Sequence, residues 1–360
     1  MRERFTQHWL CVCLAFTAII FFLLPTSFVN NFYLPKIFSP IANALNAVTS
    51  KTAFPIGQLV FYLGVFTLLI FTILKVKIAI KERKWSTLKK PAFQLLKLFL
   101  VVFILFQLSY GLSFKRPGLA NHLQLDTNRI QPIELQNFTL STINWCNEHI
   151  SDFDYEKDSF KNMVKWTHES YEHLIEKHGY FLPIKPSVKR VIEPTIMSRF
   201  GISGIYFPFT AEANVNGDIP AVIQPFVIAH EMAHQKGIAP ENEANFSAYL
   251  AGINSDNISL QFSAKYAALR YCLAYTVDSV LRDSLFNLCN ESLRNQIEEH
   301  SAYWQNYRGL LGKISSQVNN AFLKFNGQQD GIKSYGNFLS LVLAWERKTQ
   351  QNSTYRYLLE

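Results

Sequence analysis

Residues 219–246 read IPAVIQPFVIAHEMAHQKGIAPENEANF, and this stretch decides the fold of the second half of the chain. Asp218 is a good N-cap, so we expect a helix over Ile219–Gln235, which Gly237 ends. A proline at the first turn then opens a second helix over residues 240–252. Because the glycine lets the chain reverse, the second helix can present side chains to the first.

The first of these helices carries the pattern HExxH, in which His230 and His234 flank Glu231. Residues four apart lie on the same face of a helix, so the two imidazoles can converge on one ion. The carboxylate of Glu231 projects beside that ion, where it can take a proton from bound water. The pattern therefore predicts a Zn²⁺ site with Glu231 as the catalytic base. Two exposed histidines without a metal are the alternative.

A catalytic zinc site of this kind needs a third protein ligand. The start of the second helix, PENEAN at residues 240–245, offers two carboxylates, Glu241 and Glu243. Residues two apart on a helix point about 200° apart, so only one of the two can face the ion. The residues alone leave both candidates open.

This pattern resembles the gluzincin metalloproteases, in which HExxH is followed by a helix carrying E-x-x-A-D or E-x-x-A-N. Glu241, Ala244 and Asn245 match the second form. The resemblance implies that Glu241 is the third ligand. It also implies that Asn245 orients one of the ligands without binding the metal itself. Glu243 stays the alternative, because its Asn-Glu-Ala triplet is similar to the thermolysin-like version. The gap from His234 is short for either register.

The same resemblance implies a tyrosine or histidine that stabilises the oxyanion of the reaction. Tyr206, Tyr249 and Tyr335 are the candidates. Packing in the core is the alternative for each of them.

The chain as a whole also resembles an uncharacterised family of three-span bacterial membrane proteins. Those proteins carry HE(L/M)AHQ-x-G and then E-x-E-A-N-F, where this chain reads HEMAHQKG and ENEANF. The likeness extends to GIYFPFTAEANVN at residues 204–216 and to SYG at Ser334–Gly336. It implies a place in a bacterial inner membrane, and it brings no substrate.

Three uncharged apolar stretches dominate the first third of the chain, at about 9–28, 55–74 and 98–114. Each approaches the ~17–25 residues that a membrane-spanning helix needs. Buried core helices are one alternative, and a cleaved signal peptide is another for the first stretch. The nearest Ala-x-Ala, at residues 42–44, lies far beyond that stretch, so we expect an uncleaved anchor. Residues 1–114 are therefore predicted to form a membrane anchor with three transmembrane helices.

The cations indicate the orientation of this anchor. The loop over residues 75–90 contains seven Lys or Arg and one Glu, and an excess of cations marks cytoplasmic loops. The amino terminus is then cytoplasmic, and residues 115–360 lie on the periplasmic side. Because this loop supplies most of the net charge of +8, the charge indicates topology and no nucleic-acid partner.

Composition agrees with a membrane protein. Charged residues make up 17% of the chain, against about 25% in soluble domains, and hydrophobic residues make up 49%. Disordered and fibrous proteins are excluded, and an ordinary soluble enzyme is disfavoured. Of the five cysteines, Cys272 and Cys289 are the pair that an oxidising compartment would join.

The predicted fold is α-rich, with three transmembrane helices followed by an α+β zincin-like domain over 115–360. The expected elements are helices over 139–178, 291–325 and 334–347, extended chain over 180–194, and a strand over 204–215. In the zincin plan that strand lines the cleft and pairs with an extended peptide.

These patterns predict a membrane-anchored zinc metallopeptidase that hydrolyses peptide or protein substrates outside the cytoplasm. A non-catalytic zincin-fold binding or scaffold module is the alternative. An intramembrane protease is disfavoured, because the apolar lead-in to His230 is short and is interrupted by Pro220, Gln224 and Pro225. The sequence gives no indication of the oligomeric state.

Overall fold

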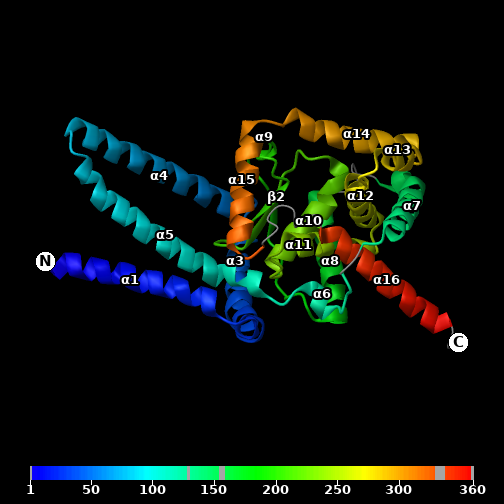
Figure 1. Ribbon diagram of the computed structural model, residues 1–360, viewed down its shortest axis with the longest axis horizontal. Helices are drawn as coiled ribbons and strands as arrows, with labels where there is room; N and C mark the ends of the chain where they lie inside the picture. Colours follow the sequence, from blue (N-terminus) through cyan, green and yellow to red (C-terminus); the bar gives the residue numbers. More distant parts are fainter. Residues whose placement is uncertain (1, 128–129, 154–158, 329–336, 358–360) are drawn as a thin grey trace.

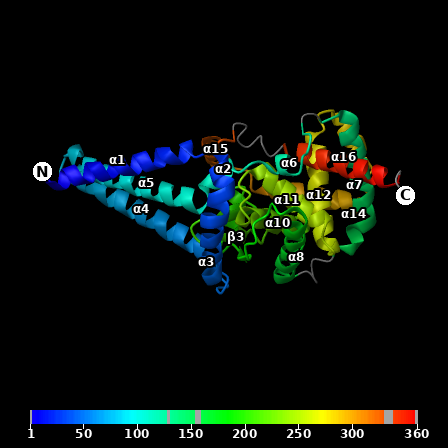
Figure 2. The same ribbon diagram turned by 90° about the horizontal axis from the view of Figure 1, so that it is seen from below.

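The computed structural model describes residues 2–127, 130–153, 159–328 and 337–357. Three long helices extend side by side from one end of a helical domain (Figure 1). They are α1 (Arg2–Leu23), α4 (Ile56–Lys81) and α5 (Lys89–Ser109). The start of α1 and the turn between α4 and α5 both lie at the end of the long helices that is far from the domain (Figures 1 and 2).

The predicted apolar helices near the amino terminus are confirmed, with different boundaries. Ile56–Lys81 and Trp85–Ser109, which joins the short η2 (Trp85–Leu88) to α5, are long and apolar enough to cross a membrane. The first candidate span ends at Leu23 rather than Phe28, because Pro25 has no N–H with which to continue the helix. Two helices, or three if the bent first pair counts as one span, fit a bilayer within the described residues.

The chain turns by 92° after α1 and then runs across the ends of the long helices. This stretch comprises α2 (Thr26–Phe28), the π-helix η1 (Val29–Phe38) and α3 (Ser39–Thr49). Tyr33 and Phe38 from η1 are fully buried in a cluster that also contains Tyr206 and Ala239 of the domain. The segment between α1 and α4 therefore packs directly against the domain.

Helices build most of the domain, around a small sheet. After η3 (Gly111–Lys115), its helices and strands are α6 (Leu119–His122), α7 (Pro132–His149), η4 (Ile150–Asp152), α8 (Phe160–His178), β1 (Val188–Arg190), α9 (Pro194–Arg199), β2 (Gly204–Phe207), β3 (Glu212–Val215), η5 (Ala221–Ile223), α10 (Gln224–Gln235), α11 (Glu241–Ile253), α12 (Ile258–Tyr275), α13 (Ser279–Asn287), α14 (Glu291–Asn306), α15 (Leu310–Phe325) and α16 (Asn337–Tyr357).

The sheet has the order β1-β3-β2, with β1 parallel and β2 antiparallel to β3. Residues 204–215 were predicted as one strand and form a hairpin instead. Pro208 cannot donate to a ladder, and Ala211 adopts a left-handed φ of 54°, so the chain turns between the two strands. The order leaves β2 at one edge of the sheet, beside α10.

Several predicted helices are divided. The segment 139–178 contains α7 and α8, separated by η4, and the segment 291–325 contains α14 and α15. The helix predicted from Ile219 begins at Gln224, because Pro220 holds an extended backbone at ψ 132° before η5. Asp218 is therefore not its N-cap.

Polar side chains fix where other helices begin. The side chains of Ser159, Asn257, Asp278 and Asn290 each accept a backbone N–H in the first turn of α8, α12, α13 and α14. Each such cap contributes about 1 kcal/mol to helix stability. The ends of these helices thus follow from local sequence.

A buried ion pair joins the sheet to α4. Lys189 of β1 lies 2.5 Å from Glu212 of β3, and the Glu212 carboxylate also accepts the backbone N–H groups of Ile56 and Gly57. Both charged side chains are almost completely buried. One carboxylate therefore neutralises the lysine and caps the helix that the sequence assigns to the membrane.

The four cysteines whose side chains the structure describes, Cys13, Cys146, Cys272 and Cys289, are all free. The suggested pairing of Cys272 with Cys289 is therefore wrong for this structure. Burial raises the pKa of both thiols, to about 12 for Cys272 and about 11 for Cys289.

Candidate metal centre

The turn between α10 and α11 sets the position of the predicted ligands. Gly237 adopts a left-handed φ of 83°, and the N–H groups of Gly237 and Ile238 bond back to the carbonyls of His234 and Ala233. A Cβ at this glycine would stand 2.9 Å from Leu182 and 3.3 Å from Phe38, so there is little room for a side chain. The chain then reverses and starts α11 at Glu241.

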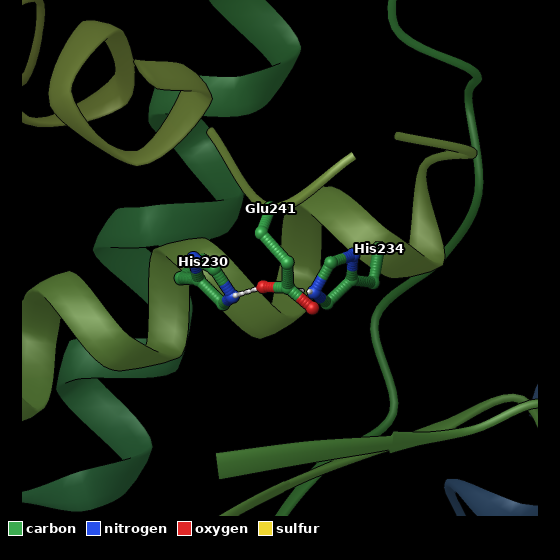
Figure 3. Close-up of side chains that lie close together, drawn as sticks. All are labelled: His230, His234 and Glu241. Carbon is green, nitrogen blue, oxygen red and sulfur yellow. Dashed lines mark ion pairs between the residues drawn. The ribbon is translucent and has the colours of Figure 1, made fainter. Parts of the chain in front are cut away.

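Glu241 reaches back between the two histidines of α10 (Figure 3). Its Oε2 lies 3.2 Å from His230 Nε2 and 3.7 Å from His234 Nε2. All three ligand atoms lie within 4.8 Å of one another. Tetrahedral metal bonds of about 2.0–2.1 Å would place ligand atoms about 3.3 Å apart, so the oxygen lies near that distance from both nitrogens and the group could hold a metal ion.

Hydrogen bonds hold both imidazoles with Nε2 facing inward. His230 Nδ1 lies 2.8 Å from Asn245 Oδ1, while Asn245 Nδ2 donates to the Tyr271 hydroxyl at 3.1 Å. His234 Nδ1 lies 2.7 Å from the carbonyl oxygen of Ile238. Because both partners are acceptors, each Nδ1 carries a proton, and Nε2 is the nitrogen that is left to face a metal.

A residue at the end of α5 reaches the same site. The hydroxyl of Tyr110, which directly follows α5, lies 2.9 Å from His234 Nδ1 and 3.4 Å from the Ile238 carbonyl oxygen. Tyr110 is buried, and it packs against Tyr206 with ring centroids 4.9 Å apart. The end of α5 and the metal-ligand helix are therefore in direct contact.

Glu231 lies beside the triad with a free oxygen. Its side chain is buried, and its Oε2 has no hydrogen-bond partner among the described residues. Gly204 of β2 packs so closely that a Cβ there would overlap the Glu231 carboxylate. Burial raises the pKa of Glu231 to about 7, against the opposing effect of the two imidazoles. An unpartnered buried carboxylate of this pKa is suited to accept a proton from water.

Comparison with known families gives one match. The family model described as a protein of unknown function (DUF3810) matches residues 33–343, which is most of the chain. The chain belongs to the DUF3810 family. No curated protein and no solved structure matched it. The DUF3810 match includes both α4 and α5 and the whole of α10 and α11, and the family description assigns no activity.

Without a metal the triad is held as an ion pair. Burial opposes the charged form of His234, but the hydrogen bond and charge of Glu241 raise the pKa of its imidazole to about 9. Burial also opposes the charged form of Glu241 and would raise its pKa. The hydrogen bonds to the two histidines nevertheless hold the pKa of Glu241 well below its usual range. A metal must therefore displace a proton from His234 at neutral pH.

Glu243 lies apart from the triad. Its Oε1 accepts the backbone N–H of Leu119 at 3.0 Å, and its carboxylate fills the space in which a Cβ of Gly118 would stand. Glu243 thus anchors α6, while Glu241 faces the histidines. The side chains of Glu241 and Glu243 point in nearly opposite directions because the two residues are two apart on one helix.

The three tyrosine candidates have different surroundings. Tyr206 is buried, its ring centroid lies 6.5 Å from that of His234, and its hydroxyl has no partner in the described part of the chain. Burial raises the pKa of Tyr206, so its hydroxyl stays protonated and can donate. Tyr249 instead donates to Glu346 at 2.9 Å within the core. Tyr335 lies outside the described residues.

Sequence reasoning missed Tyr110 and Gly204. Tyr110 fell inside a stretch predicted to span the membrane, and it stands 124 residues from its partner His234. Gly204 was only the first residue of a predicted strand. Neither carries a local pattern, because each acts through a contact that only the folded chain creates.

Proposed function

We propose that this protein is a membrane-anchored zinc metallopeptidase of gluzincin type, with its active site at the triad of His230, His234 and Glu241. The observation that carries the proposal is the convergence of these three ligand atoms beside Glu231, whose Oε2 has no hydrogen-bond partner among the described residues. Two imidazoles and one carboxylate are a ligand set of catalytic zinc sites, which leave a fourth position open.

When bound, zinc would lower the pKa of a bound water to about 7 and polarise a substrate carbonyl. Glu231 Oε2 takes a proton from water and passes it to the leaving nitrogen, a role that its pKa near neutrality favours. Asn245 and the Ile238 carbonyl keep the imidazoles in the tautomer that presents Nε2. The Tyr206 hydroxyl, which is protonated and has no partner among the described residues, would be the donor that stabilises negative charge on the substrate oxygen.

The edge strand β2 supports a peptide substrate. It borders Glu231 through Gly204, and its outer side is not paired with another described strand. An extended peptide can add to such an edge through main-chain hydrogen bonds. Because Tyr110 links the end of α5 to His234, the bond to be cleaved must come close to the membrane surface.

We also propose an orientation of the chain in the membrane. The amino terminus and the cation-rich loop over 75–90 lie at the same end of the long helices, opposite the domain (Figure 1). With that loop in the cytoplasm, the domain lies on the periplasmic side of a bacterial inner membrane. A reporter that is active only in the periplasm should therefore be active when fused to the carboxyl terminus. Activity from a cytoplasmic reporter alone would reverse the orientation.

Replacing the two glutamates of α11 separately tests the third ligand. We expect Glu241→Ala to weaken zinc binding by more than the 10–100-fold that loss of an outer hydrogen-bonding partner costs. Glu243→Ala should leave zinc affinity within a few-fold of wild type and instead lower stability by about 1–3 kcal/mol, since the Leu119 N–H loses its acceptor. Zinc titration and thermal unfolding of the two matched variants measure both effects. The reverse pattern of zinc affinities would make Glu243 the ligand.

The zinc affinity should depend on pH in a defined direction. Since the pKa of His234 is raised to about 9 in the metal-free site, zinc competes with a proton below that pH and binds more tightly as pH rises. One displaced proton corresponds to about tenfold in affinity per pH unit between pH 7 and 9. Glu241→Gln removes the charge that holds the proton, so its affinity should rise less steeply. Equal slopes for the two proteins would contradict this description of the site.

A further inference from the structure

The helix α15 (Leu310–Phe325) lies across the junction between the long apolar helices and the domain (Figure 1). Most of its large apolar side chains share one face, at three- and four-residue steps, and most of that face is exposed. Leu310 is 72% exposed, Val318 64% and Phe325 58%, and Ile314 is also exposed. In water such an arrangement is unfavourable, because each of these side chains would leave its apolar surface hydrated.

The opposite face of α15 is small and mostly polar, and it turns towards the protein. Gly312, Ser315 and Asn319 are partly buried there, and Leu323 is completely buried. The amphipathic helix is thus reversed relative to a helix that covers a soluble core, whose apolar face would point inward. The outward face of α15 must meet an apolar medium.

Contacts at its last turns show which medium this is. Phe322 packs on Phe106 and Phe114, with ring centroids 5.8 and 5.9 Å apart. Phe325 packs on Phe22 of α1 and Phe103 of α5, at 5.7 and 6.0 Å. Phe103 stands six residues before the end of α5, which corresponds to about 9 Å along that helix. The apolar face of α15 is therefore continuous with the apolar surface of the candidate spans.

We propose that α15 lies in the boundary between headgroups and acyl chains of the bilayer leaflet that faces the domain. An amphipathic helix in this position buries its apolar face about 5–10 Å deep, which matches the level of Phe103. Lys313 and Lys324 are exposed and flank the apolar face, where their ammonium groups reach the lipid phosphates. The inference rests on the apolar helices spanning a bilayer, and it is independent of any metal.

Spin labels on the full-length chain in phospholipid nanodiscs test this placement. Cys11 and Cys13 are replaced by alanine. Ile314→Cys and Val318→Cys are then made separately, and each new cysteine carries one spin label. The matched control is Val280, which is 73% exposed and belongs to α13, a helix on the side of the domain away from the three long helices (Figure 1). Collisions with oxygen, which partitions into lipid, are compared with collisions with a water-soluble nickel chelate.

We expect oxygen collisions to exceed nickel collisions at 314 and 318, and nickel collisions to dominate at 280. Nickel dominance at all three positions would place α15 in water and overturn the proposal. Protection from both reagents at 314 and 318 would also overturn it, and dipolar broadening between labels would then identify a second copy as the occupant. Because all three labelled side chains are exposed, the labels leave the fold intact.

Discussion

The Glu231→Gln variant should bind zinc as the wild type does and hydrolyse peptides about 10²–10⁴-fold more slowly. An amide has almost the size of the carboxylate, and none of the three ligand atoms changes. It cannot, however, accept the proton that Glu231 Oε2 is free to take. Proton transfer by a positioned side chain is worth this range of rate. Cleavage of a peptide library, measured by mass spectrometry on zinc-loaded protein, gives the comparison.

The matched control is His230→Ala, which should lose zinc and hydrolysis together because a ligand is removed. If zinc-loaded wild-type protein cleaves nothing that the Glu231→Gln form leaves intact, the peptidase proposal loses its support. A binding or scaffold module at the membrane would then be the better account of the metal site.

The Glu212→Ala variant should lose about 3–5 kcal/mol of stability, the cost of leaving one partner of a buried ion pair alone. Among the described residues, Lys189 would keep the Thr52 hydroxyl and the Phe54 carbonyl as partners, and neither carries a charge. The N–H groups of Ile56 and Gly57 would also lose their acceptor at the start of α4. The free energy of unfolding of the full chain in mixed micelles measures this loss.

Two further variants separate the contribution of the ion pair from that of the cap at the start of α4. Lys189→Met/Glu212→Met removes both charges and should recover part of the loss, with the uncapped start of α4 accounting for the remainder. Glu212→Gln keeps an acceptor for one N–H, so its loss of stability should lie between that of Glu212→Ala and that of the double variant. A loss below about 1 kcal/mol in Glu212→Ala would mean that this ion pair does not join the sheet to α4.

The sequence predicted the parts of the site that lie on one helix or on two helices in succession. The spacing of His230 and His234 fixes their common face, and Gly237 permits the reversal that brings Glu241 back to them. These relationships are local, and periodicity and turn chemistry are sufficient to infer them. The helix-rich fold and the apolar amino-terminal helices follow from the same kind of signal.

The contacts that the sequence did not predict join distant segments. Tyr110 meets His234, and Glu212 meets both Lys189 and the start of α4. Pairings over such separations depend on how the helices pack, and no spacing along the chain encodes them. The outward apolar face of α15 was missed for a related reason: periodicity shows that a helix is amphipathic, but only the packed structure shows which way its apolar face points.

The metal content of the purified full-length protein tests the central claim most directly. The account predicts one zinc ion per chain that survives dialysis, that is absent from His230→Ala and His234→Ala, and that is retained by Glu243→Ala. A folded wild-type chain that binds no zinc when the metal is supplied, or a His230→Ala variant that keeps its zinc, would contradict it.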